Sequence, residues 1–429
     1  MADAANVPEQ DRATPPCPHF GPCGGCQLQH LTYPAQLALK AARLNQLLAA
    51  TNLTIPELQL HASPPLAYRN RIRLTLAEHA GQLRAGYLTA NAPQPALTDI
   101  APASSSNQPT FLAITQCPIA APMLWRTTEA LLTILNNQPD FWLRNPRFKL
   151  DQLELFTTAD ESALQFTLHL RTAAKSLPTQ ITAAFTTLCE TLRTELPQLT
   201  GASVALLPLA SKDRSRRNEL PRPGPTWGAP GLLYPVSQIA PSTAEPATNW
   251  VPRGAFFQIN RFLIPKLLSL VTEGRSGQLA FDLYAGVGLF CRALAHSFTR
   301  VTAVEIAEPA ASALASTKLR NLQAVKATTL DFLRTAVLDR DRPDLIVLDP
   351  PRTGAGPEVC ALLARIAAPT LVYVSCSPET LPTDLTTLAT SGYTVTELHL
   401  LDLFPQTNHI ETIAILTRTA STIPNHAPV

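Results

Sequence analysis

The sequence predicts a chain of two parts, in which a parallel α/β sheet follows a strand-rich α+β region. Short apolar runs in the last third alternate with helix-like stretches, and this rhythm is typical of a parallel sheet with helices on both faces. The runs are 279–284, 301–306, 345–348 and 371–375. Two further strand candidates, near 393–400 and 409–417, close the chain. From about 66 to 250 the pattern is strand-like, so we place the boundary near Trp250.

One amphipathic helix is predicted ahead of the strand-rich region, between Pro34 and Ala50. Apolar residues recur there at helical spacing, at Leu37, Ala41, Leu44 and Leu48. This helix would separate a short cysteine-bearing segment from the strands that follow.

The overall charge does not mark a nucleic-acid-binding protein. Lys and Arg total 34 against 32 Asp and Glu, which gives a net charge of +2. Any contact with a nucleic acid must therefore come from local basic groups. The candidates are alternate arginines of one predicted strand and a run in a later loop: Arg69, Arg71, Arg73, Arg214, Arg216 and Arg217.

Neither a secretory signal nor a membrane segment is predicted. Residues 1–16 mix acids with prolines and lack an apolar core, so we expect a disordered tail there. No uncharged apolar run approaches the ~18 residues that a bilayer requires. We therefore expect a cytoplasmic protein without membrane contacts. In that setting its eight cysteines indicate metal ligands or catalytic thiols before disulfides.

A cofactor site is predicted where the first strands of the parallel sheet end. The segment 281–288 ends a predicted strand and places Tyr284, Gly286 and Gly288 before a helix. Glycines let the backbone pass close to a ligand, and a strand-end acid can bind ribose hydroxyls. Glu305 closes the next strand at about the separation that such an acid needs. A tight strand-to-helix turn would explain the glycines alone equally well.

Two more candidates for the cofactor site flank this segment. Asp349, followed by two prolines, ends another predicted strand, where open α/β sheets bind ligands. A rigid loop in which Asp349 caps a turn is the alternative. Gln258 lies just ahead of the first strand of the sheet.

Cys376 is the candidate nucleophile. It follows a predicted strand, with Ser377 suited to cap a helix and Pro378 to its first position. A thiol beside a helix N-terminus has a lowered pKa, which favours the reactive thiolate. The alternative is a buried structural cysteine, the interpretation that we keep for Cys189, Cys291 and Cys360.

This nucleophile suits methylation at C5 of uracil, because C5 attacks a methyl donor only after activation. A thiolate that adds to C6 makes C5 nucleophilic, and a base must then remove the C5 proton. Glu411, or His409 close to it, could be that base. A glutamate at the start of a strand is more often a solvated charge, so position alone does not assign Glu411.

A compact cysteine motif lies near the N-terminus. Cys17, Cys23 and Cys26 are close in sequence, and Cys117 is the natural fourth thiol. Four thiolates suit a [4Fe–4S] cluster or a structural zinc ion equally, with His19 and His30 as conceivable zinc ligands. A thioredoxin-like Cys-x-x-Cys is disfavoured, because no strand precedes it and Cys17 would have no role.

Motifs along nearly the whole chain resemble those of the RNA 5-methyluridine methyltransferases, including the iron–sulfur rRNA enzymes and the tRNA thymine-loop enzyme. They occur in family order: PCPHFGPCGGCQLQH, YRNRIRL, FFQIN, FDLYAGVGLF, DPPRTGAG, YVSCSPETL and DLFPQTNHIET. Two positions depart from the family pattern, where Ala285 replaces a common Cys and Leu289 a common Asn or Gly. The second change removes one expected side-chain contact to the cofactor.

The resemblance implies a fold, cofactors and residue roles. It implies a class I (Rossmann-like) S-adenosylmethionine methyltransferase domain at 251–420, preceded by an iron–sulfur and RNA-binding region at 17–250. Cys376 would attack the base and Glu411 would take the C5 proton. The S-adenosylmethionine pocket would include Gln258, Tyr284, Gly286, Gly288, Glu305 and Asp349. A [4Fe–4S] cluster would be held by Cys17, Cys23, Cys26 and Cys117, with a structural role beside Arg69, Arg71 and Arg73.

The expected substrate is RNA, first of all 23S rRNA, because the cysteine motif is typical of the rRNA enzymes, and the expected state is a monomer. A tRNA target is the alternative. A methyltransferase acting on an exocyclic amine is disfavoured, because such enzymes usually carry an aromatic residue where this chain has Arg352. A non-catalytic iron–sulfur RNA-binding protein or RNA chaperone would need neither Cys376 nor Glu411.

Overall fold

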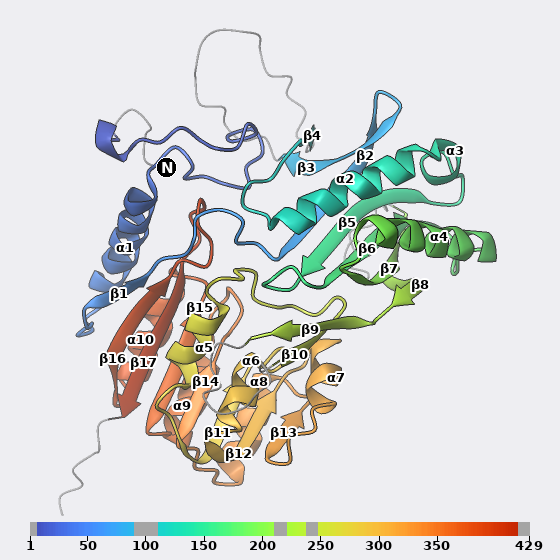
Figure 1. Ribbon diagram of the computed structural model, residues 1–429. Helices are drawn as coiled ribbons and strands as arrows, with labels where there is room; N and C mark the ends of the chain where they lie inside the picture. The colour runs from blue at the N-terminus through green and yellow to red at the C-terminus, as the bar shows by residue number, and fades with distance from the viewer. Residues whose placement is uncertain (1–6, 90–109, 210–220, 237–247, 419–429) are drawn as a thin grey trace, which may run out of the picture. The chain divides into compact units, whose positions relative to one another are not determined.

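A computed structural model of the chain describes residues 7–89, 110–209, 221–236 and 248–418. The chain forms two compact units (Figure 1). Unit 1 contains Met1–Tyr33, Pro64–Pro235 and Ile259–Phe262, and unit 2 contains Pro34–Ser63, Val236–Gln258 and Leu263–Val429. The division differs from the single boundary expected near Trp250, because the segment 34–63 packs into unit 2. The expected tail at 1–16 is described from residue 7, with a 3-10 helix at Glu9–Asp11.

Unit 2 contains the predicted α/β sheet. Its eight strands lie in the order β1-β16-β17-β15-β14-β11-β12-β13. They are β1 (Leu58–His61), β11 (Gly277–Leu283), β12 (Phe298–Val304), β13 (Leu322–Val325), β14 (Leu345–Leu348), β15 (Thr370–Ser375), β16 (Tyr393–Leu401) and β17 (Glu411–Arg418). Neighbouring strands are parallel except for β17, which is antiparallel to both β15 and β16. All four residues of β14 are buried, as expected for a parallel strand covered on both faces.

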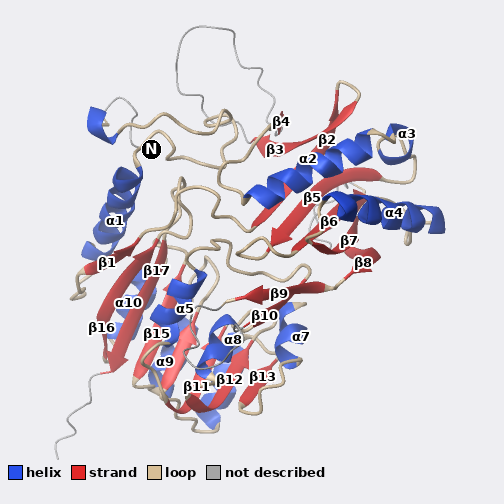
Figure 2. Cartoon of the chain, viewed as in Figure 1, coloured by secondary structure: helices blue, strands red, loops and turns tan. Residues whose placement is uncertain are grey.

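Helices flank this sheet (Figure 2). They are α1 (Tyr33–Ala49), α5 (Ile264–Thr272), α6 (Leu289–Leu294), α7 (Ala310–Ala315), α8 (Thr329–Leu338), α9 (Pro357–Ile366) and α10 (Leu381–Ala389). A short strand, β10 (Thr248–Pro252), lies between α1 and α5 in sequence and belongs to the same unit. Residues of α1, α8, α9 and α10 share one apolar core with the sheet. The α/β prediction for this part of the chain is therefore confirmed.

The helix predicted at 34–50 is α1, but its buried face differs from the predicted one. Gln36, Lys40, Leu44 and Leu48 are buried, whereas Leu37 from the predicted apolar set is only half-buried. The buried residues recur every four positions, so the polar Gln36 and Lys40 lie on the same helix face as Leu44 and Leu48. Hydrophobicity alone could not predict this, because the partners of the polar pair lie far away in sequence.

Unit 1 is built on a seven-stranded sheet in the order β4-β3-β2-β5-β6-β7-β8. Its strands are β2 (Arg71–His79), β3 (Gln82–Thr89), β4 (Thr110–Ala113), β5 (Lys149–Thr157), β6 (Leu164–Arg171), β7 (Leu199–Leu207) and β8 (Arg222–Gly228), and β9 (Gly231–Pro235) follows outside the sheet. Only β6 and β7 are parallel neighbours within it, and α4 (Thr179–Glu195) connects them.

The helices of unit 1 pack on this sheet to form its core. Besides α4 they are α2 (Pro122–Asn136) and the short α3 (Pro139–Trp142). Leu124, Leu131 and Phe185 are fully buried from the helices, against Leu153 and Leu168 from the strands. Among the described residues, no helix combines the length and apolar character that crossing a lipid bilayer requires.

Candidate active site

The candidate residues of unit 2 gather at one edge of the sheet. Tyr284, Glu305, Asp349 and Cys376 directly follow β11, β12, β14 and β15, respectively. The carboxyl ends of parallel strands share an edge, which is where open α/β sheets bind ligands. Glu411 is the first residue of β17, and because this strand is antiparallel, its start lies at the same edge.

The register of β15 and β17 brings Cys376 and Glu411 together. Ser375 is paired with Thr412 across these antiparallel strands, so the next position along pairs Cys376 with Glu411. Side chains directly opposite each other in such a ladder have Cβ atoms about 4.5–5.5 Å apart. Glu411 is 3% exposed, whereas Cys376 is half-buried and therefore accessible to a substrate. A thiol and a buried carboxyl thus share one small site.

The electrostatics of this pair differ from the expected activated thiolate. Burial, followed by the charges of Glu411 and Asp349, raises the pKa of Cys376 to about 11, and Arg352 opposes this shift. Burial and the charge of Asp349 also raise the pKa of Glu411 well above its usual value. Burial raises the pKa of Asp349 itself to about 7. The free protein therefore holds Cys376 as a thiol, and the prediction of a lowered pKa is wrong.

The helix expected to activate Cys376 begins too late in the chain. Helix α10 starts at Leu381 with Thr380 as its N-cap, not at Pro378 after Ser377. The backbone N–H of Ser377 donates instead to Ser375 Oγ, at 3.3 Å. Because the effect of a helix terminus falls off within a turn, Cys376 gains little from α10, and its pKa is raised by burial first and by its carboxyl neighbours second.

The glycine loop after β11 has the backbone shape that its sequence predicts. Gly286 and Gly288 have φ values of +56° and +90°, a region that side chains disfavour. Glu305 holds this loop, because its Oε2 accepts from the N–H of Gly286 at 2.9 Å. Its Oε1 accepts from the N–H groups of Ile306 and Ala307 at 2.7 and 2.6 Å. Glu305 therefore shapes the loop, whatever it also contacts on a ligand.

Asp282 supports the same loop from below. It is buried, and its Oδ2 accepts from the backbone N–H of Cys291 in α6 at 2.8 Å. Burial raises its pKa to about 7. Tyr284, two residues later, adopts a left-handed φ of +60°, a conformation that non-glycine residues keep mainly where the surrounding structure enforces it.

Ala285 and Leu289, which depart from the family pattern, are buried, and so is Gln258. Ala285 and Leu289 are both buried at 7% exposure, so Leu289 joins the core of unit 2. Gln258 is buried between β10 and α5. It stays a predicted cofactor contact.

The sequence analysis did not identify Asp384, a buried residue that holds the loop after Asp349 and Arg352 by hydrogen bonds. Asp384 in α10 accepts from the N–H groups of Ala355 and Gly356 at 2.8 and 3.2 Å. It also accepts from the hydroxyl of Tyr373 at 2.6 Å. The only sequence signal was Gly354, where an added Cβ would approach Asp384 Oδ2 to 2.7 Å.

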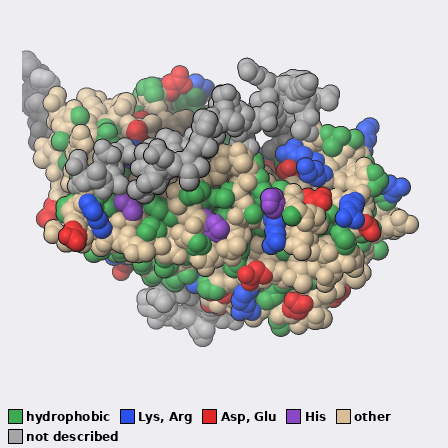
Figure 3. Space-filling view, turned by 90° about the horizontal axis from the view of Figure 1, so that it is seen from above, with side chains coloured by type: hydrophobic (Ala, Val, Ile, Leu, Met, Phe, Trp, Pro, Cys, Tyr) green, Lys and Arg blue, Asp and Glu red, His purple; other side chains and the backbone are tan. Residues whose placement is uncertain are grey.

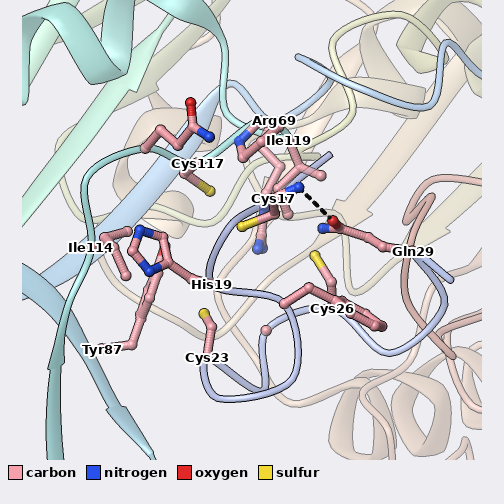
Figure 4. A pocket seen from close by; sticks show the side chains of 14 residues that line it. Cys17, His19, Cys23, Cys26, Gln29, Arg69, Tyr87, Ile114, Cys117 and Ile119 are labelled. Carbon is pink, nitrogen blue, oxygen red and sulfur yellow. Dashed lines mark hydrogen bonds between the residues drawn. The ribbon is translucent and has the colours of Figure 1, made fainter. Parts of the chain in front are cut away.

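The three cysteines of the N-terminal motif and Cys117 line one pocket of unit 1. Cys17, Cys23, Cys26 and Cys117 surround it, and their thiols turn toward the same space (Figure 4). All four are free of disulfides. As they stand, no three His, Cys, Asp or Glu side chains among the described residues are arranged to hold a metal ion.

Other side chains of this pocket bear on which metal group it could take. His19 lines the pocket, and its Nε2 accepts from the N–H of Thr115 at 2.9 Å. His30 is not among the lining residues, and its ring is tilted by 36° against that of Phe20, with ring centroids 5.8 Å apart. Arg69 also lines the pocket, and its buried Nε has no hydrogen-bond partner among the described residues. A positive charge beside four thiols would stabilise the thiolates that any metal group here requires.

The predicted basic face of the first strand is not a free one. Arg71 and Arg73 both pair with Glu154 of β5, and Arg71 also stacks on Phe156, with its Cζ 4.2 Å from the ring centroid. Figure 3 shows basic and acidic side chains interspersed on the face in view. The basic run of Arg214, Arg216 and Arg217 lies outside the described residues.

A glycine loop and acidic strand ends at the carboxyl edge of this sheet define a class I S-adenosylmethionine-dependent methyltransferase. A family model described as tRNA (Uracil-5-)-methyltransferase matches residues 250–419. A 23S rRNA (uracil(1939)-C(5))-methyltransferase RlmD from Chromohalobacter salexigens is 30% identical over 97% of this chain and 80% of its own length. An uncharacterized RNA methyltransferase from Thermotoga maritima is 29% identical over 95% of this chain and 86% of its own.

One solved structure shares the fold over most of the chain. The tRNA (uracil-54, C5)-methyltransferase of Pyrococcus abyssi, in complex with S-adenosyl-L-homocysteine, superposes with a TM-score of 0.64 at 22% identity. The match covers 92% of this chain and 86% of that one. With the RlmD match, these findings show that the chain belongs to the RNA uracil-C5 methyltransferases.

Proposed function

We propose that this enzyme methylates C5 of a uridine in RNA through a covalent adduct with Cys376, and that Glu411 is its base. The register that pairs Cys376 with Glu411 carries this proposal. As a thiolate, Cys376 adds to C6 and moves an electron pair toward C5. S-adenosylmethionine, when bound, supplies the methyl group that C5 takes. Glu411 then removes the C5 proton, the C5–C6 double bond re-forms, and the Sγ–C6 bond breaks to release the thiolate.

We assign the cofactor to the glycine loop and the strand ends beside it. The contacts would come from Gln258, Tyr284, Gly286, Gly288, Glu305 and Asp349. Support comes from the positive φ values of the glycines and from the position of Asp349 at the end of β14. The buried Leu289 offers no polar group to the cofactor, so binding would rest on backbone and acidic groups.

We further propose that the cysteine pocket holds a [4Fe–4S] cluster through Cys17, Cys23, Cys26 and Cys117. Four thiols in one pocket match the donor set of this cluster. Arg69, which lines the same pocket, adds a positive charge beside the thiolates, and the N–H of Thr115 occupies Nε2 of His19, which disfavours zinc ligation through that atom. The role would be structural, because methyl transfer moves no single electrons.

The RNA that we propose is 23S rRNA. Support comes from the RlmD relative, whose name states that target, and tRNA is the alternative because of the tRNA enzymes among the matches. Unit 1, which covers most of the region expected at 17–250, would contribute RNA binding. A ribosomal substrate would place the enzyme in the cytoplasm, and we expect it to act as a monomer.

The residue roles are tested by two variants with opposite outcomes. Cys376→Ala should abolish both turnover and covalent RNA adducts. Glu411→Gln should still attack and methylate the uridine, but release of the RNA from the covalent adduct should slow about 10²–10⁴-fold. A denaturant-resistant, methylated adduct should then accumulate on gels. RNA containing 5-fluorouridine should trap the wild-type protein similarly, since fluorine cannot leave as a proton does.

Contrary outcomes would be informative. Methylation by Cys376→Ala would rule out the covalent route, and normal turnover by Glu411→Gln would move the base elsewhere, first to His409. The target is tested by mass-spectrometric mapping of 5-methyluridine in 23S rRNA and tRNA from a deletion strain. Loss from tRNA alone would overturn the ribosomal assignment.

A further inference from the structure

A buried ion pair joins helix α1 to the segment that leads into Glu411. Lys40 Nζ donates to Asp402 Oδ1 at 2.6 Å, and the side chains are 2% and 0% exposed. Lys40 also donates to the carbonyl of Phe404 at 3.0 Å. These contacts span more than 360 positions of sequence yet lie within unit 2.

A second pair of side chains continues the same connection. Gln36, one turn before Lys40, donates through Nε2 to Gln406 Oε1 at 2.9 Å and accepts from the Gln406 N–H at 2.9 Å. Gln406 has a left-handed φ of +69°, so its backbone is bent at the point that Gln36 holds. Thr407 closes the turn by donating from its N–H to the carbonyl of Phe404 at 3.2 Å.

The segment held in this way is short and ends at the base. It begins after β16, where the Asp402 N–H donates to the carbonyl of His61 in the same unit at 3.0 Å. It ends at Glu411, the first residue of β17. Of the nine residues from Asp402 to Ile410, α1 therefore holds three, and these contacts set how the chain enters β17.

We propose that Lys40 and Gln36 are positioning residues for Glu411, an inference that rests on the proposed role of Glu411 as base. Their chemistry favours orientation over stability. A buried ion pair contributes little net stability compared with apolar residues of similar size. Charged and amide hydrogen bonds instead fix direction, which apolar contacts would not do. The step served is removal of the C5 proton by the Glu411 carboxylate, with return of the C6–Sγ electron pair to Cys376.

The test measures release of the adduct separately from its formation. Lys40→Met and Gln36→Met should form the methylated adduct at the wild-type rate but release it about 10–100-fold more slowly, because misplacement by about 1 Å can cost this much. Lys40→Met leaves Asp402 buried without its cation, so Lys40→Met/Asp402→Asn provides a neutral pair in case the single variant does not fold. Gln46→Met, at an exposed position of α1, is the matched control and should behave as wild type.

Glu411→Gln, measured in parallel, separates this inference from the proposed function. If Glu411→Gln accumulates adduct but Gln36→Met and the double variant release RNA at the wild-type rate, the positioning role is wrong and the base assignment stands. If these variants slow adduct formation and release equally and also lower thermal stability, Lys40 and Gln36 serve only the stability of the fold, and the positioning role is wrong. If Glu411→Gln accumulates no adduct, the proposed function fails and this inference fails with it.

Discussion

The pKa of Cys376 offers a direct test of how the site is organised. Burial and the neighbouring carboxyls place it at about 11, against an ordinary value of 9.0. At pH 8 the thiolate fraction is therefore on the order of one in a thousand, compared with about one in ten for an ordinary cysteine. Alkylation of Cys376 by iodoacetamide, which requires the thiolate, should rise with pH to a midpoint near 11. Peptide mass spectrometry can follow Cys376 apart from the other seven cysteines.

Glu411→Gln sharpens this test, because Glu411 contributes the largest of the charge effects on that pKa. The neutral side chain should shift the alkylation midpoint to lower pH and increase the rate at pH 8. A conservative change at an exposed acid such as Glu358 should leave the midpoint unchanged. A wild-type midpoint below about 8.5, or one that Glu411→Gln does not move, would refute the proximity on which the proposed mechanism depends.

Three further predictions follow from other features. Burial raises the pKa of Asp282 to about 7 in the folded protein, against an ordinary value of 3.8. Its contribution to stability should therefore fall as pH rises between these values, by about 4 kcal/mol at most. Asp349 and Glu411 shift in the same direction, so Asp282→Asn should reduce the decline between pH 5 and 8 in urea denaturation without removing it. Glu305→Ala should weaken S-adenosylmethionine binding by roughly 1–3 kcal/mol in calorimetry, and unchanged affinity would remove Glu305 from the site. Anaerobically purified protein should be brown and contain about four irons. Replacement by serine of any one proposed ligand should remove the colour; these are Cys17, Cys23, Cys26 and Cys117. A colourless protein with one zinc ion would overturn the cluster assignment.

Sequence patterns predicted the sheet of unit 2 well because each strand carries its own signal. A run such as Leu345–Leu348 is buried on both faces, so it is apolar throughout and visible without context. Once the strands are predicted, their ends are known as well, and these ends give the positions of Glu305, Asp349 and Cys376. The pairing of Cys376 with Glu411 was not visible, because it depends on the register of a strand that reverses direction.

The failures came from groups whose behaviour depends on distant partners. The pKa of Cys376 was predicted from the local pattern Ser377-Pro378, but burial of the thiol raises it, and Glu411 and Asp349, from other parts of the sheet, add to that shift. Lys40 similarly lies outside the apolar set predicted for its helix, and it is buried because Asp402, far away in sequence, is its partner. Arg71 and Arg73 suggested a basic surface, yet Glu154 neutralises part of it from the next strand.

The antiparallel ladder between β15 and β17 also determines which length changes the enzyme can tolerate. Side chains alternate between the faces of a strand, so a one-residue insertion or deletion inside β17 would turn every following side chain to the opposite face. The same change placed ahead of Thr370, in the loop that leads into β15, could be absorbed there, while Cys376 and Glu411 kept their places across the ladder. The backbone hydrogen bonds of the ladder thus keep the thiol and the carboxyl opposite each other. Relatives could vary widely in loop length and composition and still inherit the same pair.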